Sequence, residues 1–122
     1  MRFINSKIHA IADYASGVLM LSLPLFINLS SQTNATTIAL VTGIFILLLS
    51  ILTRYEGGLI PTIPLYAHLG VDIVIGLALI VIVLASEFTG AINYFFWLMG
   101  AAALFFGCFT VLRPVQRRKF KH

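Results

Sequence analysis

The stretch His9-Ala-Ile-Ala-Asp13-Tyr-Ala-Ser-Gly17 returns later in the chain as His68-Leu-Gly-Val-Asp72-Ile-Val-Ile-Gly76, with three identical residues at the same spacing. The offset is 59 residues (68 minus 9) in a chain of 122. Residues that stand four apart share one face of a helix. A histidine and an aspartate inside an apolar segment are costly unless they face other protein groups or water. The two stretches therefore predict two helices whose polar faces point into a bundle.

The chain around these stretches has the composition of an integral membrane protein. Hydrophobic residues make up 60% of the chain and charged residues 10%, and the mean hydropathy is +1.02. Arg54 is the only charged residue between Tyr14 and Tyr55, and none lies between Phe88 and Leu112. Because about 20 apolar residues suffice for a helix to cross a ~30 Å hydrocarbon core, we predict an all-α membrane protein. The alternating strands of a membrane β-barrel are absent from the sequence.

Four transmembrane helices are expected in a single domain of residues 1–122, at residues 8–27, 38–54, 64–85 and 92–112. Pro64 suits a first helical turn, and Pro114 stops the last helix. The first helix is not expected to be a cleaved signal peptide, because Asp13 interrupts it and its pattern returns in the second half.

The basic residues predict the orientation of the bundle. All eight fall at the N-terminus, in the central loop or in the C-terminal tail: Arg2, Lys7, Arg54, Arg113, Arg117, Arg118, Lys119 and Lys121. The other two loops have none, and the last contains Glu87. Basic loops remain on the cytoplasmic side, so both termini are expected there. The basic tail is expected to contact anionic lipid, and a nucleic-acid partner is not expected.

The duplication extends to the second helix of each half. Gly43 and Thr53 have counterparts in Gly100 and Thr110, at an offset of 57 residues (100 minus 43). The repeating unit is therefore expected to be a helical hairpin, with repeat 1 at about residues 1–58 and repeat 2 at about 59–122. Since each unit crosses the membrane twice, a pseudo-two-fold axis should run along the membrane normal.

Several residues in these repeats form a recurring set of short motifs. They are His9, Asp13, Gly17, Pro24, Thr53, Tyr55 and Glu56 in the first unit, and His68, Asp72, Gly76, Thr110, Arg113 and Pro114 in the second. This set resembles the SPW-repeat family of small bacterial membrane proteins, although Leu23-Pro24-Leu25 and Ile82-Val83-Leu84 replace the namesake Ser-Pro-Trp. The resemblance implies a protein of the bacterial inner membrane and no established activity.

The topology brings the polar residues to one end of the bundle, on the cytoplasmic side. The candidate polar cluster and ligand site comprises His9, Asp13, His68, Asp72, Thr53, Arg54, Glu56, Thr110 and Arg113. Close helix packing is expected at Gly17, Gly43, Gly76, Gly100 and Gly107. The first interpretation is a clamp between helices, in which Asp13 accepts hydrogen bonds from His68, Thr53 or Arg54, and Asp72 from their counterparts.

Three other interpretations use the same residues. A small oligomeric channel or proton-coupled transporter is the main alternative, because ionisable residues inside a bundle often mark ion pathways. In the half of the membrane opposite the cluster, Ser22 and Asn93 are the only polar residues expected along such a pathway. Two His and two Asp also suit a metal ion, and paired His suits haem. No nucleophile accompanies them, so an enzyme is not expected. No metal or other cofactor is assigned, and homo-oligomerisation stays open.

Two features of the fourth helix receive structural interpretations. Cys108 cannot form an internal disulfide, because it is the single cysteine. It is expected to be a packing residue. Tyr94, Phe95, Phe96 and Trp97 are expected to form an aromatic belt at the outer membrane interface.

Overall fold

The computed structural model describes residues 2–26 and 33–112 of the chain. Over these residues it contains four helices: α1 (Ser6–Phe26), α2 (Thr33–Leu52), α3 (Leu65–Ala85) and α4 (Gly90–Phe109). Each helix is long and apolar enough to cross a membrane. The predicted all-α fold with four such helices is therefore confirmed, and it is compatible with a multi-pass membrane protein.

Two helix ends differ by three residues or more from the sequence-based expectation. Helix α2 begins at Thr33, five residues before the expected start at residue 38, so the polar residues Asn34, Thr36 and Thr37 belong to its first turns. Helix α4 ends at Phe109 and not at residue 112. There the backbone becomes extended, and the Val111 N–H donates to the Ile4 carbonyl oxygen at 2.8 Å. A tertiary backbone pairing thus ends the helix before Pro114.

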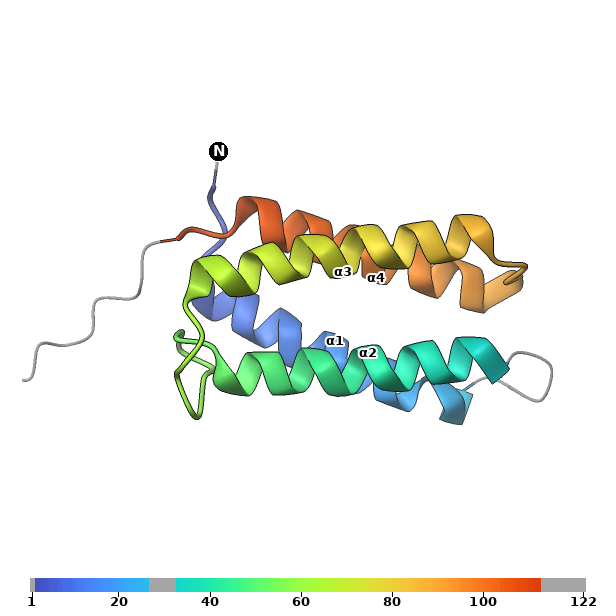
Figure 1. Cartoon of the computed structure of the whole chain (residues 1–122), viewed down its shortest axis with the longest axis horizontal. Coiled ribbons are helices and arrows are strands. Elements are labelled where there is room, and N and C mark those ends of the chain that lie inside the picture. Colours follow the sequence, from blue (N-terminus) through green and yellow to red (C-terminus); the bar gives the residue numbers. More distant parts are fainter. Residues whose placement is uncertain (1, 27–32, 113–122) are drawn as a thin grey trace, which may run out of the picture.

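The helices form two antiparallel hairpins, α1 with α2 and α3 with α4, which are also the two most closely packed pairs (Figure 1). The α2–α3 loop and both ends of the described chain lie at the same end of the bundle. At this end, Ile4 pairs with Thr110, and Thr53 pairs with Ile63, in two isolated parallel β-bridges. We call this the polar end of the bundle.

Facing glycines allow the two helices of each hairpin to approach closely. A methyl group on Gly43 would lie 3.0 Å from the Gly17 carbonyl oxygen, and one on Gly100 would lie 3.1 Å from that of Gly76. A methyl group on Gly107 would lie 3.1 Å from the Leu69 carbonyl oxygen. Small residues at such contacts let helix backbones meet in an apolar solvent.

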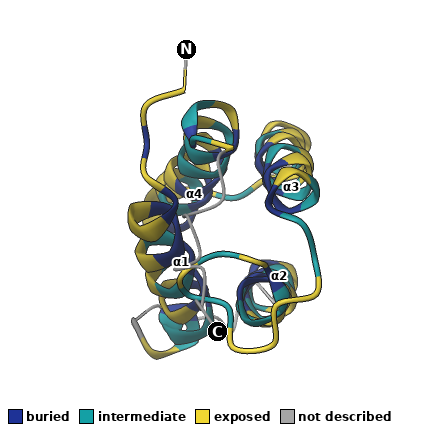
Figure 2. Ribbon diagram, turned by 90° about the vertical axis from the view of Figure 1, so that its left-hand side faces the viewer, coloured by how far each residue is buried: buried dark blue, intermediate teal, exposed yellow. Residues whose placement is uncertain are grey.

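The buried residues face the centre of the bundle, and the exposed residues cover its outside (Figure 2). An apolar core lies away from the polar end and takes side chains from all four helices: Met20, Leu23, Ala35, Ala39, Leu79, Val83, Ile92, Phe96 and Met99. Large apolar side chains are also exposed on every helix, such as Val18, Val41, Val74 and Leu98. This outer apolar surface is what a lipid-facing bundle requires.

Two expectations for α4 are corrected. Phe96 is fully buried and contacts Phe88, whereas Tyr94 is 74% exposed, so the four aromatic residues do not form one belt. Their positions on the helix point in different directions, which separates them. Cys108 is exposed and is not a packing residue, because the inward position at this level of the helix belongs to Gly107.

Candidate functional site

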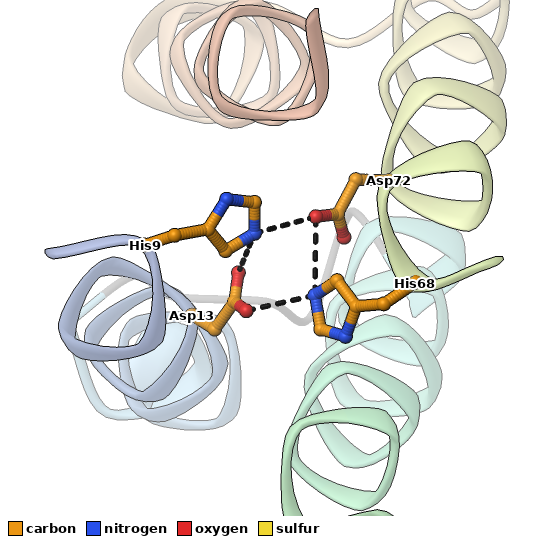
Figure 3. Close-up of side chains that lie close together, drawn as sticks. All are labelled: His9, Asp13, His68 and Asp72. Atoms are coloured by element: carbon orange, nitrogen blue, oxygen red, sulfur yellow. Dashed lines mark hydrogen bonds and ion pairs between the residues drawn. The ribbon is translucent and has the colours of Figure 1, made fainter. Parts of the chain in front are cut away.

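Four side chains converge between the two hairpins at the polar end of the bundle (Figure 3). They are His9 and Asp13 from α1, with His68 and Asp72 from α3, and we call them the His/Asp cluster. Both histidines are 0% exposed, and the aspartates are 8% and 4% exposed. The spacing of four residues along each helix places His and Asp one turn apart on the same inward face. The sequence-based expectation that these residues lie together is therefore met.

The shortest contacts in the cluster join one hairpin to the other. His9 Nε2 lies 2.7 Å from Asp72 Oδ2, and His68 Nε2 lies 2.8 Å from Asp13 Oδ2. The contacts within each helix are longer, at 3.2 Å from His9 Nε2 to Asp13 Oδ1 and 3.1 Å from His68 Nε2 to Asp72 Oδ2. The four groups thus form a ring in which nitrogen and oxygen atoms alternate.

One threonine contacts the other ring nitrogen of each imidazole. His9 Nδ1 lies 2.5 Å from Thr110 Oγ1, and His68 Nδ1 lies 2.6 Å from Thr53 Oγ1. Each hydroxyl also donates to the carbonyl oxygen four residues earlier in its own chain segment. Since a hydroxyl has one proton to donate, its oxygen must accept a proton from Nδ1. Both imidazoles therefore carry hydrogen on Nδ1 and direct Nε2 at the carboxylates.

The proton count of the cluster follows from these contacts. With both Nδ1 positions protonated, the cluster is neutral when each His–Asp pair across the hairpins carries one more proton, either on Nε2 or on the carboxyl group. The four side chains are then neutral together in either arrangement, with two imidazolium–carboxylate pairs or with two imidazole–carboxylic acid pairs. Overall neutrality removes most of the cost of burying four ionisable groups in a bilayer.

The structure adds Tyr55 to the site. Its hydroxyl donates to Asp13 Oδ2 at 2.9 Å, and its ring centroid lies 5.2 Å from that of His68. Burial and the negative charge of Asp13 raise the pKa of Tyr55 above its ordinary value of 10.0. The sequence identifies Tyr55 only as part of a motif, because its position just beyond α2 gives no helical spacing toward the cluster. No tyrosine stands at the matching position of the second half, where the chain has Leu112.

Three other expected members lie elsewhere or outside the described residues. Glu56 accepts hydrogen bonds from the Ser6 hydroxyl at 2.8 and 2.9 Å. Arg54 is exposed, and its backbone N–H donates to the Ile63 carbonyl oxygen at 2.8 Å. Both residues follow the end of α2, in a segment of bends and turns, and both are exposed. Arg113 lies outside the described residues.

The hydrogen-bond pattern expected for Asp13 also needs correction. Asp13 contacts His68 as expected, but its other close partner outside its own helix is Tyr55, not Thr53 or Arg54. Thr53 is unable to donate to Asp13 because its proton goes to the Leu49 carbonyl oxygen. The threonines therefore act on the histidines and not on the carboxylates.

A cavity of about 30 Å³ adjoins the two carboxylates of the cluster. Asp13, Asp72 and Ser16 line it together with apolar side chains such as Met20, Met99 and Phe106. This volume is large enough for about one water molecule. Chemically, the site offers two imidazole nitrogens, two carboxylates and adjoining space, and it lies between the two hairpins. No protein-family model, curated protein or solved structure matches this chain.

Proposed function

We propose that this protein is a non-enzymatic, multi-pass membrane protein in which the His/Asp cluster clamps two helical hairpins together and provides a ligand or partner site. The observation that carries the proposal is the direction of the shortest contacts. Each histidine is closest to the aspartate of the other hairpin, at 2.7 and 2.8 Å. Its second ring nitrogen also contacts a threonine of the other hairpin. Polar contacts between helices replace the hydrophobic driving force that is missing within lipid.

The placement in the membrane rests on surface composition and charge. Large apolar side chains are exposed along all four helices, as expected of lipid contact. Among the described residues, the basic side chains Arg2, Lys7 and Arg54 lie at the polar end, and Glu87 lies in the loop at the opposite end. Positive loops stay in the cytoplasm, so we place the polar end and both termini there.

We also propose that the bundle is a tandem repeat with a pseudo-two-fold axis along the membrane normal. Backbone hydrogen bonds at the polar end occur in matching pairs. Ile4 N–H donates to Phe109 O and Ile63 N–H to Leu52 O, while Val111 N–H donates to Ile4 O and Arg54 N–H to Ile63 O, all at 2.7–2.8 Å. The donors and acceptors differ by the 59- and 57-residue offsets of the sequence repeat (63 minus 4, 109 minus 52). This agreement supports a duplicated hairpin and, with the motifs, a place in the SPW-repeat family and in the bacterial inner membrane.

The proposed clamp is tested by an Asp13→Asn, Asp72→Asn double variant of the full chain. In detergent we expect it to lose monodispersity and helical structure at a temperature well below that of the wild type. Glu87→Gln, which removes a carboxylate at the opposite end, serves as the control and should behave as the wild type. A double variant as stable as the control would overturn the clamp.

The same proteins in liposomes address the channel or transporter alternative. The clamp proposal expects wild-type liposomes to conduct ions no faster than empty ones. Wild-type flux that disappears in a folded double variant would instead favour transport through the cluster. Flotation of the protein, with and without its C-terminal tail, on vesicles of anionic or neutral lipid tests the proposed lipid contact. Mass determination in detergent decides the oligomeric state.

A further inference from the structure

We infer that the His/Asp cluster is a binding site for one divalent first-row transition-metal ion, with Zn²⁺ as the best-fitting ion. The ligands are Nε2 of His9 and His68 and one carboxylate oxygen each of Asp13 and Asp72. The inference deepens the proposed function, because a metal ion would join the same two hairpins through the same four side chains. It rests on the geometry, hydrogen bonding and charge of the cluster.

The four ligand atoms already converge on a common centre. One possible ligand atom from each residue lies within 4.8 Å of all the others. The nitrogen–oxygen contacts of the cluster are 2.7–3.2 Å long, with Asp13 contacting His9 through Oδ1 and His68 through Oδ2 (Figure 3). A tetrahedral zinc ion with ligands at about 2.0–2.1 Å needs ligand atoms about 3.3 Å apart. Metal binding would therefore require side-chain rotations that lengthen the nitrogen–oxygen contacts from 2.7–3.2 Å toward this value.

Hydrogen bonding outside the ring orients both histidines for metal binding. A metal-bound imidazole usually donates its second N–H to a neighbouring oxygen, which fixes the tautomer and the ring. Thr110 and Thr53 accept this hydrogen from Nδ1 of His9 and His68. Each threonine is fixed in turn by donation to a backbone carbonyl oxygen. The lone pair that remains on each imidazole is thus directed into the ring.

One nitrogen atom of the cluster, His68 Nε2, lacks a hydrogen-bond partner among the residues that the structure describes. Within the described part of the chain, His68 Nε2 is buried and has no hydrogen bond of acceptable geometry. This holds although Asp13 Oδ2 is only 2.8 Å away. Buried polar atoms are nearly always hydrogen-bonded, and an exception calls for an explanation such as a bound ion. His9 Nε2, by contrast, forms a hydrogen bond with Asp72, so His68 Nε2 is the ring nitrogen whose partner a metal ion would supply.

The charge of the site suits a divalent cation better than a monovalent or trivalent one. Two carboxylates and two neutral imidazoles carry a charge of −2, so a divalent cation makes the site neutral. Binding releases the two protons that the His–Asp contacts hold in the metal-free protein, and the net charge of the bundle is unchanged. The buried cluster therefore exchanges two protons for one ion without creating net charge in the membrane.

The ligand types select among divalent ions. Two imidazoles with two carboxylates suit Zn²⁺ and its first-row neighbours. Ca²⁺ and Mg²⁺ require six or more oxygen ligands, which the cluster does not supply. The adjoining cavity of about 30 Å³ has room for a water molecule as a further ligand.

The test uses the full-length protein in detergent, without a polyhistidine tag and stripped of metal by a chelator. Titration with Co²⁺, which reports tetrahedral coordination by its visible absorption, should saturate at one ion per chain, and Zn²⁺ should displace it. Isothermal titration in buffers of different protonation enthalpy should show the release of two protons per ion. Metal content and circular dichroism are measured on the same samples.

Two kinds of variant separate the ligands from the residues that position them. Asp72→Asn should abolish the Co²⁺ spectrum, whereas Thr53→Val and Thr110→Val keep all four ligands and should weaken binding about 10–100-fold. His122→Gln removes the third histidine of the chain and should bind as the wild type. Folded wild-type protein without a saturable spectrum, or an unchanged spectrum in Asp72→Asn, would overturn the metal site.

Failure of the metal site and failure of the clamp give different results. If the metal-free protein is folded and loses stability in the Asp13→Asn, Asp72→Asn variant but never binds Co²⁺, the clamp stands and the metal site is wrong. If the wild type binds one Co²⁺ while the metal-free double variant is as stable as the wild type, the metal site stands and the clamp is wrong.

Discussion

The contacts of His9 predict unequal coupling to the two aspartates. His9 Nε2 forms a 2.7 Å hydrogen bond with Asp72 across the hairpins, and it lies 3.2 Å from Asp13 on its own helix. The residues can be replaced by His9→Gln, Asp72→Asn and Asp13→Asn, singly and in pairs. A double-mutant cycle then isolates the energy of each pair.

The magnitudes follow from the two geometries. Hydrogen bonds between membrane helices average about 0.6 kcal/mol and reach about 1.7 kcal/mol. The short, fully buried contact with Asp72 should lie near the upper end, at about 1.5 kcal/mol. The longer contact with Asp13 resembles an i, i+4 pair, for which about 0.2–0.5 kcal/mol is typical. We therefore expect the coupling to Asp72 to be at least about three times the coupling to Asp13.

The assay is reversible unfolding of metal-free protein in mixed micelles, followed by circular dichroism. His68 supplies a second comparison, since it lies 2.8 Å from Asp13 but 3.1 Å from Asp72. Its stronger partner should therefore be Asp13. Equal couplings, or stronger coupling within each helix than between hairpins, would refute the idea that the cluster joins the hairpins.

Three further predictions concern helix packing, Tyr55 and topology. Gly76→Ala places a methyl group 2.8 Å from a backbone oxygen of α4 and should destabilise the bundle by about 1–3 kcal/mol. Gly70→Ala on the same helix meets nothing within 4 Å and should be neutral or slightly stabilising in the same unfolding assay. Because the folded state raises the pKa of Tyr55 above 10.0, its contribution to stability is complete below about pH 10 and is lost as the pH rises further. Alkaline titration of unfolding should therefore destabilise the wild type more than Tyr55→Phe, and identical pH profiles would contradict this linkage. In a cysteine-free background, a membrane-impermeant maleimide added to intact cells should label Glu87→Cys but not Lys7→Cys, and the reverse pattern would invert the proposed orientation.

The helices of this protein could be predicted because their signals are local. Runs of about 20 apolar residues mark each span, and Pro64 marks the start of α3. The end of α4 could not be predicted in the same way. Thr110 and Val111 continue an apolar pattern in the sequence, yet they leave the helix to pair with Ile4 near the other end of the chain. Such a pairing depends on where distant segments meet.

The candidate site could likewise be predicted only where its signals are local. The spacing of His9 with Asp13, and of His68 with Asp72, places each pair on one helical face. The basic residues then indicate that both faces belong to one end of the bundle. The spacing carries no information on Tyr55, which reaches Asp13 from beyond the end of α2. Only its position in three dimensions adds it to the site.

The sequence by itself determined an apolar four-helix chain with two polar helix faces, because hydrophobic length and helical spacing are properties of neighbouring residues. The tertiary structure alone decided that each histidine is closest to the aspartate of the other hairpin. It also decided that threonines orient the imidazoles, and that Arg54 and Glu56 do not join the His/Asp cluster. Those choices depend on the rotation of each helix about its axis and on how closely the helices approach. These are set by the facing glycines and by the packing of the whole bundle.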